Sequence, residues 1–261
     1  TVFADQSGNV YKYMGTHNAL GVPAYLTVAD QIDGSLLADV NNSLPEQSRV
    51  PLAHPEYLAV GNDVDLCIEI HRQLTPAEAI VLAQGIAEFN PMFYEDPILP
   101  ENFDAMELVA NNISIPIATG ERFHSIHEFE MLLKRGAVQY VRPDVCMAGG
   151  ITHSKKIAAL AEAHYVGVIP HNPLSPVSTA ACLQIAASIP NFAIQEYPVG
   201  EDKPPKSEIV RNQLVVENGF LIIPDSPGIG IEILDGMEER FPVTPRNVET
   251  RLHFDGSVID Q

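Results

Sequence analysis

The sequence DLCIEIH places a carboxylate and an imidazole on one side of a short apolar stretch. Side chains alternate between the two faces of a strand, so Glu69 and His71 share one face, whereas Leu66, Ile68 and Ile70 share the other. Burying an unpaired charge costs several kcal/mol, so the two polar groups need partners. Those partners are a metal ion, a counter-charge or a substrate.

Two further glutamates end later apolar stretches at equal intervals. Glu95 follows Glu69 by 26 positions, and Glu121 follows Glu95 by another 26. Three converging carboxylates raise one another's pKa unless a cation lies between them. Oxygen ligands favour a hard metal, so these residues predict a Mg²⁺ site. The alternative is that each glutamate is only a solvated strand end.

Three more polar side chains follow apolar stretches in the same way. Asp144 comes 23 positions after Glu121, and His171 and Glu196 end the next two stretches. The residues alone leave other readings open, because an aspartate in this setting can be a turn or cap residue. A histidine can likewise be a satisfied core residue. His71 has the same alternative, as a residue that merely fills the mouth of a barrel.

Short apolar strands alternate with helices from residue 65 onward, and this pattern is typical of a parallel sheet built from βα units. Capping boxes predict helix starts at Thr75 and Ser125, the first running to about Phe89 and the second ending near Gly136. Including DLCIEIH, six strands are predicted; the other five are PMFYED, ISIPIATGE, AVQYVRPD, YVGVIPH and NFAIQEY. In a parallel barrel, the carboxyl ends of the strands converge on one mouth, so we expect an α/β barrel with Glu69 pointing into a shared site.

The composition limits the classes of protein that this chain can represent. With 261 residues and 46% hydrophobic side chains, it can bury a full core as one large domain. A formal charge of −19 argues against nucleic acid and anionic lipid surfaces as partners. We see no membrane-length apolar run and no signal-peptide pattern, so a cytoplasmic location is expected. The three cysteines are widely spaced in apolar runs and are expected in the core.

Several motifs over residues 65–261 together resemble a known family. The sequence is similar to the enolase superfamily, in its mandelate racemase/muconate lactonizing branch, and within that branch to sugar-acid dehydratases of the D-galactonate dehydratase type. The motifs stand in the family's order and at near-identical spacing. They are Tyr94-Glu95-Asp96-Pro97, Thr119-Gly120-Glu121-Arg122, Arg142-Pro143-Asp144, Ala148-Gly149-Gly150-Ile151-Thr152, Pro170-His171-Asn172-Pro173 and Gln195-Glu196.

The resemblance implies a role for each candidate site residue. Mg²⁺ is expected on Glu69, Glu95 and Glu121, although the first ligand in this branch is commonly aspartate. His171, paired with Asp144, is expected to remove the C2 proton of the substrate, and His71 to protonate the departing 3-hydroxyl. Glu196, in its protonated form, is expected to hydrogen-bond a substrate carboxylate oxygen. Arg122 is expected to pair with a metal ligand or to contact substrate.

The implied activity is a Mg²⁺-dependent dehydration of a sugar acid, such as the aldonate galactonate, to a 2-keto-3-deoxy acid. Related racemases and cycloisomerases commonly use a lysine from the second barrel strand, and this sequence has no lysine between Lys12 and Lys134. A racemase, an epimerase or a cycloisomerase of the same superfamily is the alternative enzyme. A barrel relic without catalytic activity is the alternative from another class.

The sequence also predicts how the chain is divided. Residues 1–25 are expected to be a remnant of the family's α+β capping region with the entry to the barrel, and residues 26–64 a poorly matching early barrel segment. Residues 65–215 are expected to form the barrel units that carry the site, and residues 216–261 a segment returning to the cap side. Because the front half looks incomplete, we expect a homo-oligomer that buries it.

Overall fold

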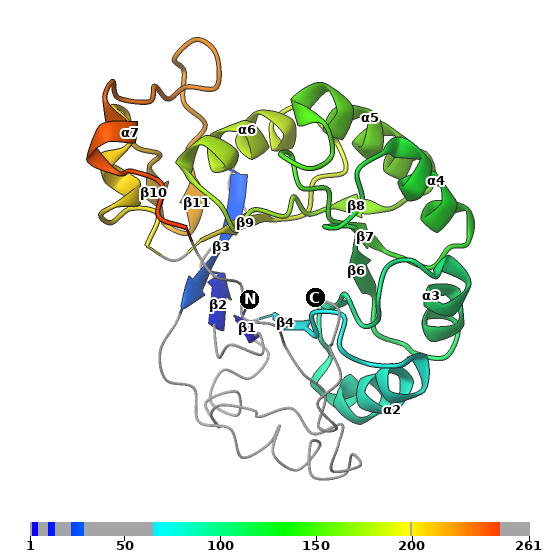
Figure 1. Ribbon diagram of the computed structural model, residues 1–261. Helices are drawn as coiled ribbons and strands as arrows, with labels where there is room; N and C mark the ends of the chain where they lie inside the picture. The colour runs from blue at the N-terminus through cyan, green and yellow to red at the C-terminus, as the bar shows by residue number, and fades with distance from the viewer. Residues whose placement is uncertain (1, 5–9, 14–21, 29–64, 199, 246–261) are drawn as a thin grey trace.

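The computed structural model describes residues 2–4, 10–13 and 22–28, for which the backbone is given, together with residues 65–198 and 200–245. Within these residues the strands follow one another around a ring, and the helices lie outside it (Figure 1). This arrangement confirms the predicted α/β barrel. It also places the polar ends of successive strands next to one another.

The six predicted strands are all present, and five of them pair in sequence order. Parallel pairing joins β4 to β5, β5 to β6, β6 to β7 and β7 to β8. The bounds are β4 (Leu66–Glu69), β5 (Phe93–Glu95), β6 (Ile117–Thr119), β7 (Tyr140–Val141), β8 (Gly167–Val168) and β9 (Gln195–Tyr197).

Three strands near the start of the chain close the ring between β4 and β9. β1 (Val2–Ala4) pairs in parallel with β4, and β3 (Val22–Val28) pairs in parallel with β9. Between them, β2 (Val10–Tyr13) runs antiparallel to both. The predicted boundary between residues 25 and 26 falls inside β3, and most of the segment 26–64 lies outside the described residues.

The last described segment packs beside this closure rather than extending the ring. β10 (Val216–Glu217) and β11 (Phe220–Leu221) form a hairpin, and β11 pairs with the free part of β3. A short helix, α7 (Met237–Arg240), follows in the same outer region (Figure 1).

The helices begin where their capping residues predict. Thr75 and Ser125 each form a complete capping box, which supplies partners for amide groups that the first helical turn leaves unpaired. A 3₁₀ turn, Ala87–Phe89, extends the first helix to the predicted end. The helices that follow the strands are α2 (Pro76–Ile86), α3 (Phe103–Ala110), α4 (Ile126–Lys134), α5 (Gly150–Ala163) and α6 (Pro176–Ala186).

The core has two layers, and the alternation of β4 separates them. Cys67 points inward, where it packs with Phe93, Ala118, Ile169 and Ile194 inside the ring. Ile68, which has the opposite parity on β4, packs against the larger cluster between strands and helices. Glu69 has the same parity as Cys67, so it also faces the interior. Among the described helices, none has the length and apolar character that crossing a membrane requires.

Candidate metal and acid–base site

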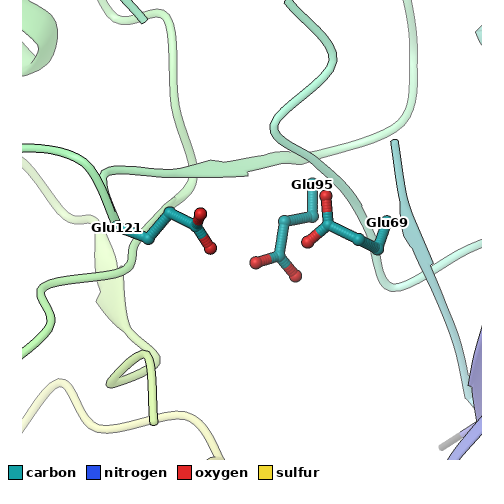
Figure 2. A group of neighbouring side chains, drawn as sticks. All are labelled: Glu69, Glu95 and Glu121. Atoms are coloured by element: carbon teal, nitrogen blue, oxygen red, sulfur yellow. The ribbon is translucent and has the colours of Figure 1, made fainter. Parts of the chain in front are cut away.

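The three glutamates predicted from their spacing meet at one end of the ring. Glu69 ends β4, Glu95 ends β5 and Glu121 lies two residues after β6. One carboxylate oxygen from each lies within 4.8 Å of the others, and the side chains point toward a common space (Figure 2). The carboxyl ends of parallel strands therefore converge on this point, as the spacing predicts.

Left-handed backbone conformations turn the chain sharply after β4 and β5. His71 and Arg72 have φ angles of 56° and 66°, and Asp96 has a φ of 39°. Such conformations cost about 1–3 kcal/mol each in residues other than glycine and occur often at functional sites. A hydrogen bond joins the two turns, because the Arg72 amide donates to the Asp96 carbonyl at 2.7 Å. They bring the Glu69 carboxylate back to accept from the His71 amide.

Two buried arginines lie among these carboxylates. Arg72 forms ion pairs with Asp96, at 2.8 Å, and with Glu121. Arg142 forms ion pairs with Glu95 and, at 2.6 Å, with Glu196. Both guanidinium groups are only about 2% exposed, so their charges act at low local dielectric.

The carboxylates of the cluster differ in how readily they ionise. Burial, together with the charges of Asp96 and Glu121, raises the pKa of Glu69 to about 8. Burial also raises the pKa of Glu95, against the opposing charge of Arg142. For Glu121 burial acts upward, but hydrogen bonding and charge from His171 lower its pKa well below the usual value. Glu69 therefore loses its proton less readily than Glu121 does.

His171 lies between two carboxylates and uses both ring nitrogens. Its Nδ1 is 2.9 Å from an Asp144 oxygen, and its Nε2 is 3.0 Å from a Glu121 oxygen. Burial by itself would lower the pKa of His171, but Glu196, Asp144 and Glu121 raise it to about 10. The ring is therefore held as an imidazolium, the form that a general base has after it accepts a proton.

Glu196 lies on β9 and is connected to Glu95 through Arg142. Its Oε2 accepts from Arg142 at 2.6 Å and from the Asn172 amide at 2.8 Å. Since both partners donate to Oε2, a proton on Glu196 has to reside on Oε1. The hydrogen bond that Glu196 is expected to donate to a substrate carboxylate oxygen would therefore come from Oε1.

His71 is also brought to the cluster, with its ring facing Arg72. Its Nε2 lies 2.8 Å from the Nη2 atom of Arg72. A guanidinium nitrogen can only donate, so Nε2 accepts and the ring proton lies on Nδ1 in this arrangement. The structure thus places His71 at the cluster, two residues from Glu69.

Arg122 lies at the rim of the site. Its Nε is 3.7 Å from Glu121, and 40% of its side chain is exposed. Together with Arg72 it lines a pocket of about 540 Å³, which also includes His124 and the apolar side chains of Phe103 and Phe123. Both expected roles of Arg122, pairing with a ligand and contacting substrate, fit this position.

The donor atoms of the three glutamates suit a hard divalent cation. All three donors are carboxylate oxygens, which Mg²⁺ prefers. The site holds six carboxyl groups and three cationic groups, which are Arg72, Arg142 and the His171 imidazolium. If all six carboxyl groups are ionised, three negative charges remain in excess. The carboxyl groups are those of Glu69, Glu95, Asp96, Glu121, Asp144 and Glu196. A divalent cation would relieve most of this excess and favour the ionised forms of Glu69 and Glu95.

Sequence reasoning missed the parts of the site that balance its charge. Arg72, Arg142 and Asp96 contact the predicted residues, but none was assigned a role in the site. A signal was available for two of them. Arg72 directly follows His71, and Arg142 comes two residues before Asp144, in a chain that has only 15 lysines and arginines. A scarce cation beside predicted acidic ligands is itself evidence for a buried ion pair.

Gly120 fixes the turn that delivers Glu121, and we expect Gly120→Ala to destabilise the fold by about 3 kcal/mol or more. Its φ is +127°, and an added Cβ would lie 2.6 Å from Cε1 of the buried Phe129. Backbone strain and overpacking both act there. Gly136→Ala is the matched control, because φ is +63° and no atom lies within 4 Å, so only about 1 kcal/mol is expected. Urea unfolding followed by circular dichroism measures both, and equal losses would contradict the packing argument.

The ring of strands defines an α/β barrel, and the acidic cluster at one end of it could hold a metal ion beside the paired histidine. Residues 57–237 match the family model described as enolase C-terminal domain-like. The chain belongs to this family, in the mandelate racemase/muconate lactonizing branch.

Individual relatives agree with this assignment. The chain is 35% identical over 224 residues to a D-galactonate dehydratase family member from Streptomyces bingchenggensis, covering 85% of this chain and 54% of that one. It is 36% identical over 210 residues to D-galactonate dehydratase from Ralstonia pickettii, covering 77% and 55%. The chain therefore spans about half the length of the curated relatives it matches.

Solved structures show the same relationship. A member of the enolase superfamily from Salmonella Typhimurium superposes with a TM-score of 0.68 at 34% identity, covering 70% of this chain and 46% of that one. A Burkholderia SAR-1 structure, provisionally assigned as a mandelate racemase/muconate lactonizing enzyme, gives a TM-score of 0.72 at 34% identity. It covers 93% of this chain and 57% of that one.

Proposed function

We propose that this protein is a Mg²⁺-dependent sugar-acid dehydratase that converts an aldonate such as D-galactonate to a 2-keto-3-deoxy acid. Glu69, Glu95 and Glu121 would hold the Mg²⁺, which when bound supplies positive charge to stabilise a substrate carboxylate as its negative charge grows. The remaining steps belong to side chains of this chain.

His171 is the proposed base. It takes the C2 proton at Nε2 while Asp144 holds the Nδ1 proton, and the electrons of the broken C–H bond form an enediolate. In the described arrangement Nε2 is occupied by Glu121. A cation on the glutamates would withdraw charge from Glu121 and lower the pKa of His171 toward the range in which an imidazole accepts protons.

His71 is the proposed acid. As the C3–O bond breaks, His71 in its imidazolium form gives a proton to the departing hydroxyl, which leaves as water, and the enediolate electrons form the C2–C3 double bond. The resulting enol tautomerises to the ketone. Oε1 of Glu196 would hydrogen-bond a carboxylate oxygen of the substrate, while Arg142 and Asn172 hold Oε2.

One observation supports this function above the others: His171 bridges Asp144 and the cluster of three glutamates. The names of two relatives, both D-galactonate dehydratases, support a sugar acid as the substrate class. Incubation with D-galactonate and Mg²⁺ should yield a 2-keto-3-deoxy acid, detected by NMR and as its semicarbazone. A panel of other aldonic and aldaric acids then defines the preference.

The same assay separates the alternatives. An epimerase or racemase would exchange the C2 proton with D₂O and invert the centre without losing water. A catalytically inactive barrel would leave every acid in the panel unchanged and unlabelled. The expected cytoplasmic location and homo-oligomeric state stay predictions.

A further inference from the structure

Behind the site lies a buried polar group that the proposed chemistry does not use. Glu201 is 3% exposed, and within the described residues its Oε1 has no hydrogen-bond partner. Its Oε2 lies 2.7 Å from the hydroxyl of Thr179 on α6. A buried carboxyl without a charged partner is costly, so its retention at this position calls for an explanation.

The contacts of Thr179 lead from Glu201 to the site. The side-chain amide nitrogen of Asn172 donates to the Thr179 hydroxyl at 2.6 Å and to the Glu196 carbonyl at 3.1 Å. A carbonyl oxygen can only accept, and this fixes which end of the Asn172 amide faces Glu196. Asn172 and Thr179 are both fully buried.

Asn172 holds Glu196 at two points and is bonded directly to His171. Its backbone amide donates to Oε2 of Glu196, and its side chain donates to the Glu196 carbonyl. Movement of Asn172 would therefore shift Glu196 and His171 together. These are the proposed carboxylate-binding group and the proposed base, and they come from different strands.

We propose that Glu201 and Thr179 are positioning residues, which lock Asn172 and thereby set the relative placement of His171 and Glu196. This inference rests on the proposed function for its catalytic consequence. Its structural part, the restraint of Asn172, does not.

The proton arrangement of the network is consistent with this role. Burial raises the pKa of Glu201 to about 7, with Thr179 and Lys206 acting downward and Asp202 upward. A protonated Glu201 can donate to Thr179, which then donates to the Ser175 carbonyl at 3.2 Å while accepting from Asn172. Every donor in this network of Glu201, Thr179 and Asn172 then has an acceptor.

The test compares Thr179→Val, which keeps the shape and removes the hydroxyl, with Thr179→Ser, which keeps the hydroxyl. With D-galactonate, Thr179→Val should lower kcat about 10- to 100-fold and change KM less than about threefold, because the groups are misplaced rather than lost. Thr179→Ser should recover most of that kcat. A second pair of variants should behave in the same way: Glu201→Leu should lower kcat, and Glu201→Gln should retain most of it.

A matched control removes a buried hydroxyl elsewhere. Ser154 on α5 is 1% exposed, and its Oγ has no hydrogen-bond partner within the described residues, so Ser154→Ala should leave kcat unchanged. Thermal melts of all variants separate general destabilisation from misplacement. A loss of kcat in Thr179→Val that Thr179→Ser does not restore, or that Ser154→Ala shares, would overturn the proposal.

Hydrogen exchange provides a readout that is independent of activity. The Asn172 amide is protected by Glu196, and a fragment covering residues 168–175 should exchange that amide at least about tenfold faster in Thr179→Val. Unchanged protection overturns the restraint even if the enzyme dehydrates D-galactonate. If no variant or wild-type protein turns over any sugar acid, the proposed function fails, while faster exchange still supports the restraint.

Discussion

We expect His171→Asn to abolish both dehydration and the exchange of the substrate's C2 proton with D₂O, and His71→Asn to block dehydration but leave exchange measurable. His171 is the group whose Nε2 faces the acidic cluster while Asp144 holds Nδ1, so no enediolate forms without it. In the proposed mechanism His71 acts only when the hydroxyl departs, so the enediolate formed without it should be reprotonated. Each loss should amount to about 10² to 10⁴ in rate.

The control is His164→Asn at the exposed carboxyl end of α5, which makes the same chemical change away from the site. NMR of recovered D-galactonate reports exchange and product together. Exchange that survives in His171→Asn and vanishes in His71→Asn would reverse the two roles. Undiminished dehydration in both variants would eliminate the mechanism.

Glu69→Gln should fold as well as the wild type but lose Mg²⁺ binding, and with it at least about 10³-fold in turnover. The substitution keeps the shape of a carboxyl that burial and its acidic neighbours Asp96 and Glu121 already hold partly protonated near neutral pH. In the wild type, Mg²⁺ at about 100 times its Kd should add about 2.7 kcal/mol of stability, seen as a rise in melting temperature. The variant should show little of that rise.

The affinity for Mg²⁺ should depend on pH, and the raised pKa of Glu69 defines the direction of that dependence. The pKa of Glu69 is raised to about 8, and a carboxylate must lose its proton to bind a metal, so Mg²⁺ affinity in the wild type should increase from pH 6 to pH 9. Glu69→Gln should lose that contribution. Calorimetric titration measures it, with the exposed Glu88→Gln as the control. Equal Mg²⁺ effects in Glu69→Gln and Glu88→Gln would place the metal elsewhere.

The elements from residue 65 to 197 could be predicted because their signals are local. Capping boxes at Thr75 and Ser125 need only four residues each, and β4 shows its alternation within seven. The closure of the ring could not be predicted in this way. β1 and β3 pair with β4 and β9 across long sequence separations, and no short pattern encodes such pairing.

The candidate site likewise has residues that could be predicted from the sequence and contacts that could not. The ligand set followed from one glutamate per strand end, because topology converts regular spacing into proximity. The partners of each carboxylate depend on side-chain direction instead. Arg142 reaches from the end of β7 to Glu95 and Glu196, and Thr179 reaches from α6 to Asn172, and neither path is visible in spacing.

Arg142 connects the proposed metal ligand Glu95 with Glu196, the group expected to meet the substrate. A cation bound by Glu95 would weaken the ion pair between that carboxylate and Arg142, and the guanidinium would then interact more strongly with Glu196 and with a bound anion. We therefore expect the binding of metal and of a sugar acid to be cooperative through Arg142. Coupling of this kind is reciprocal, so the factor by which metal tightens the binding of a sugar acid equals the factor by which the sugar acid tightens the binding of metal.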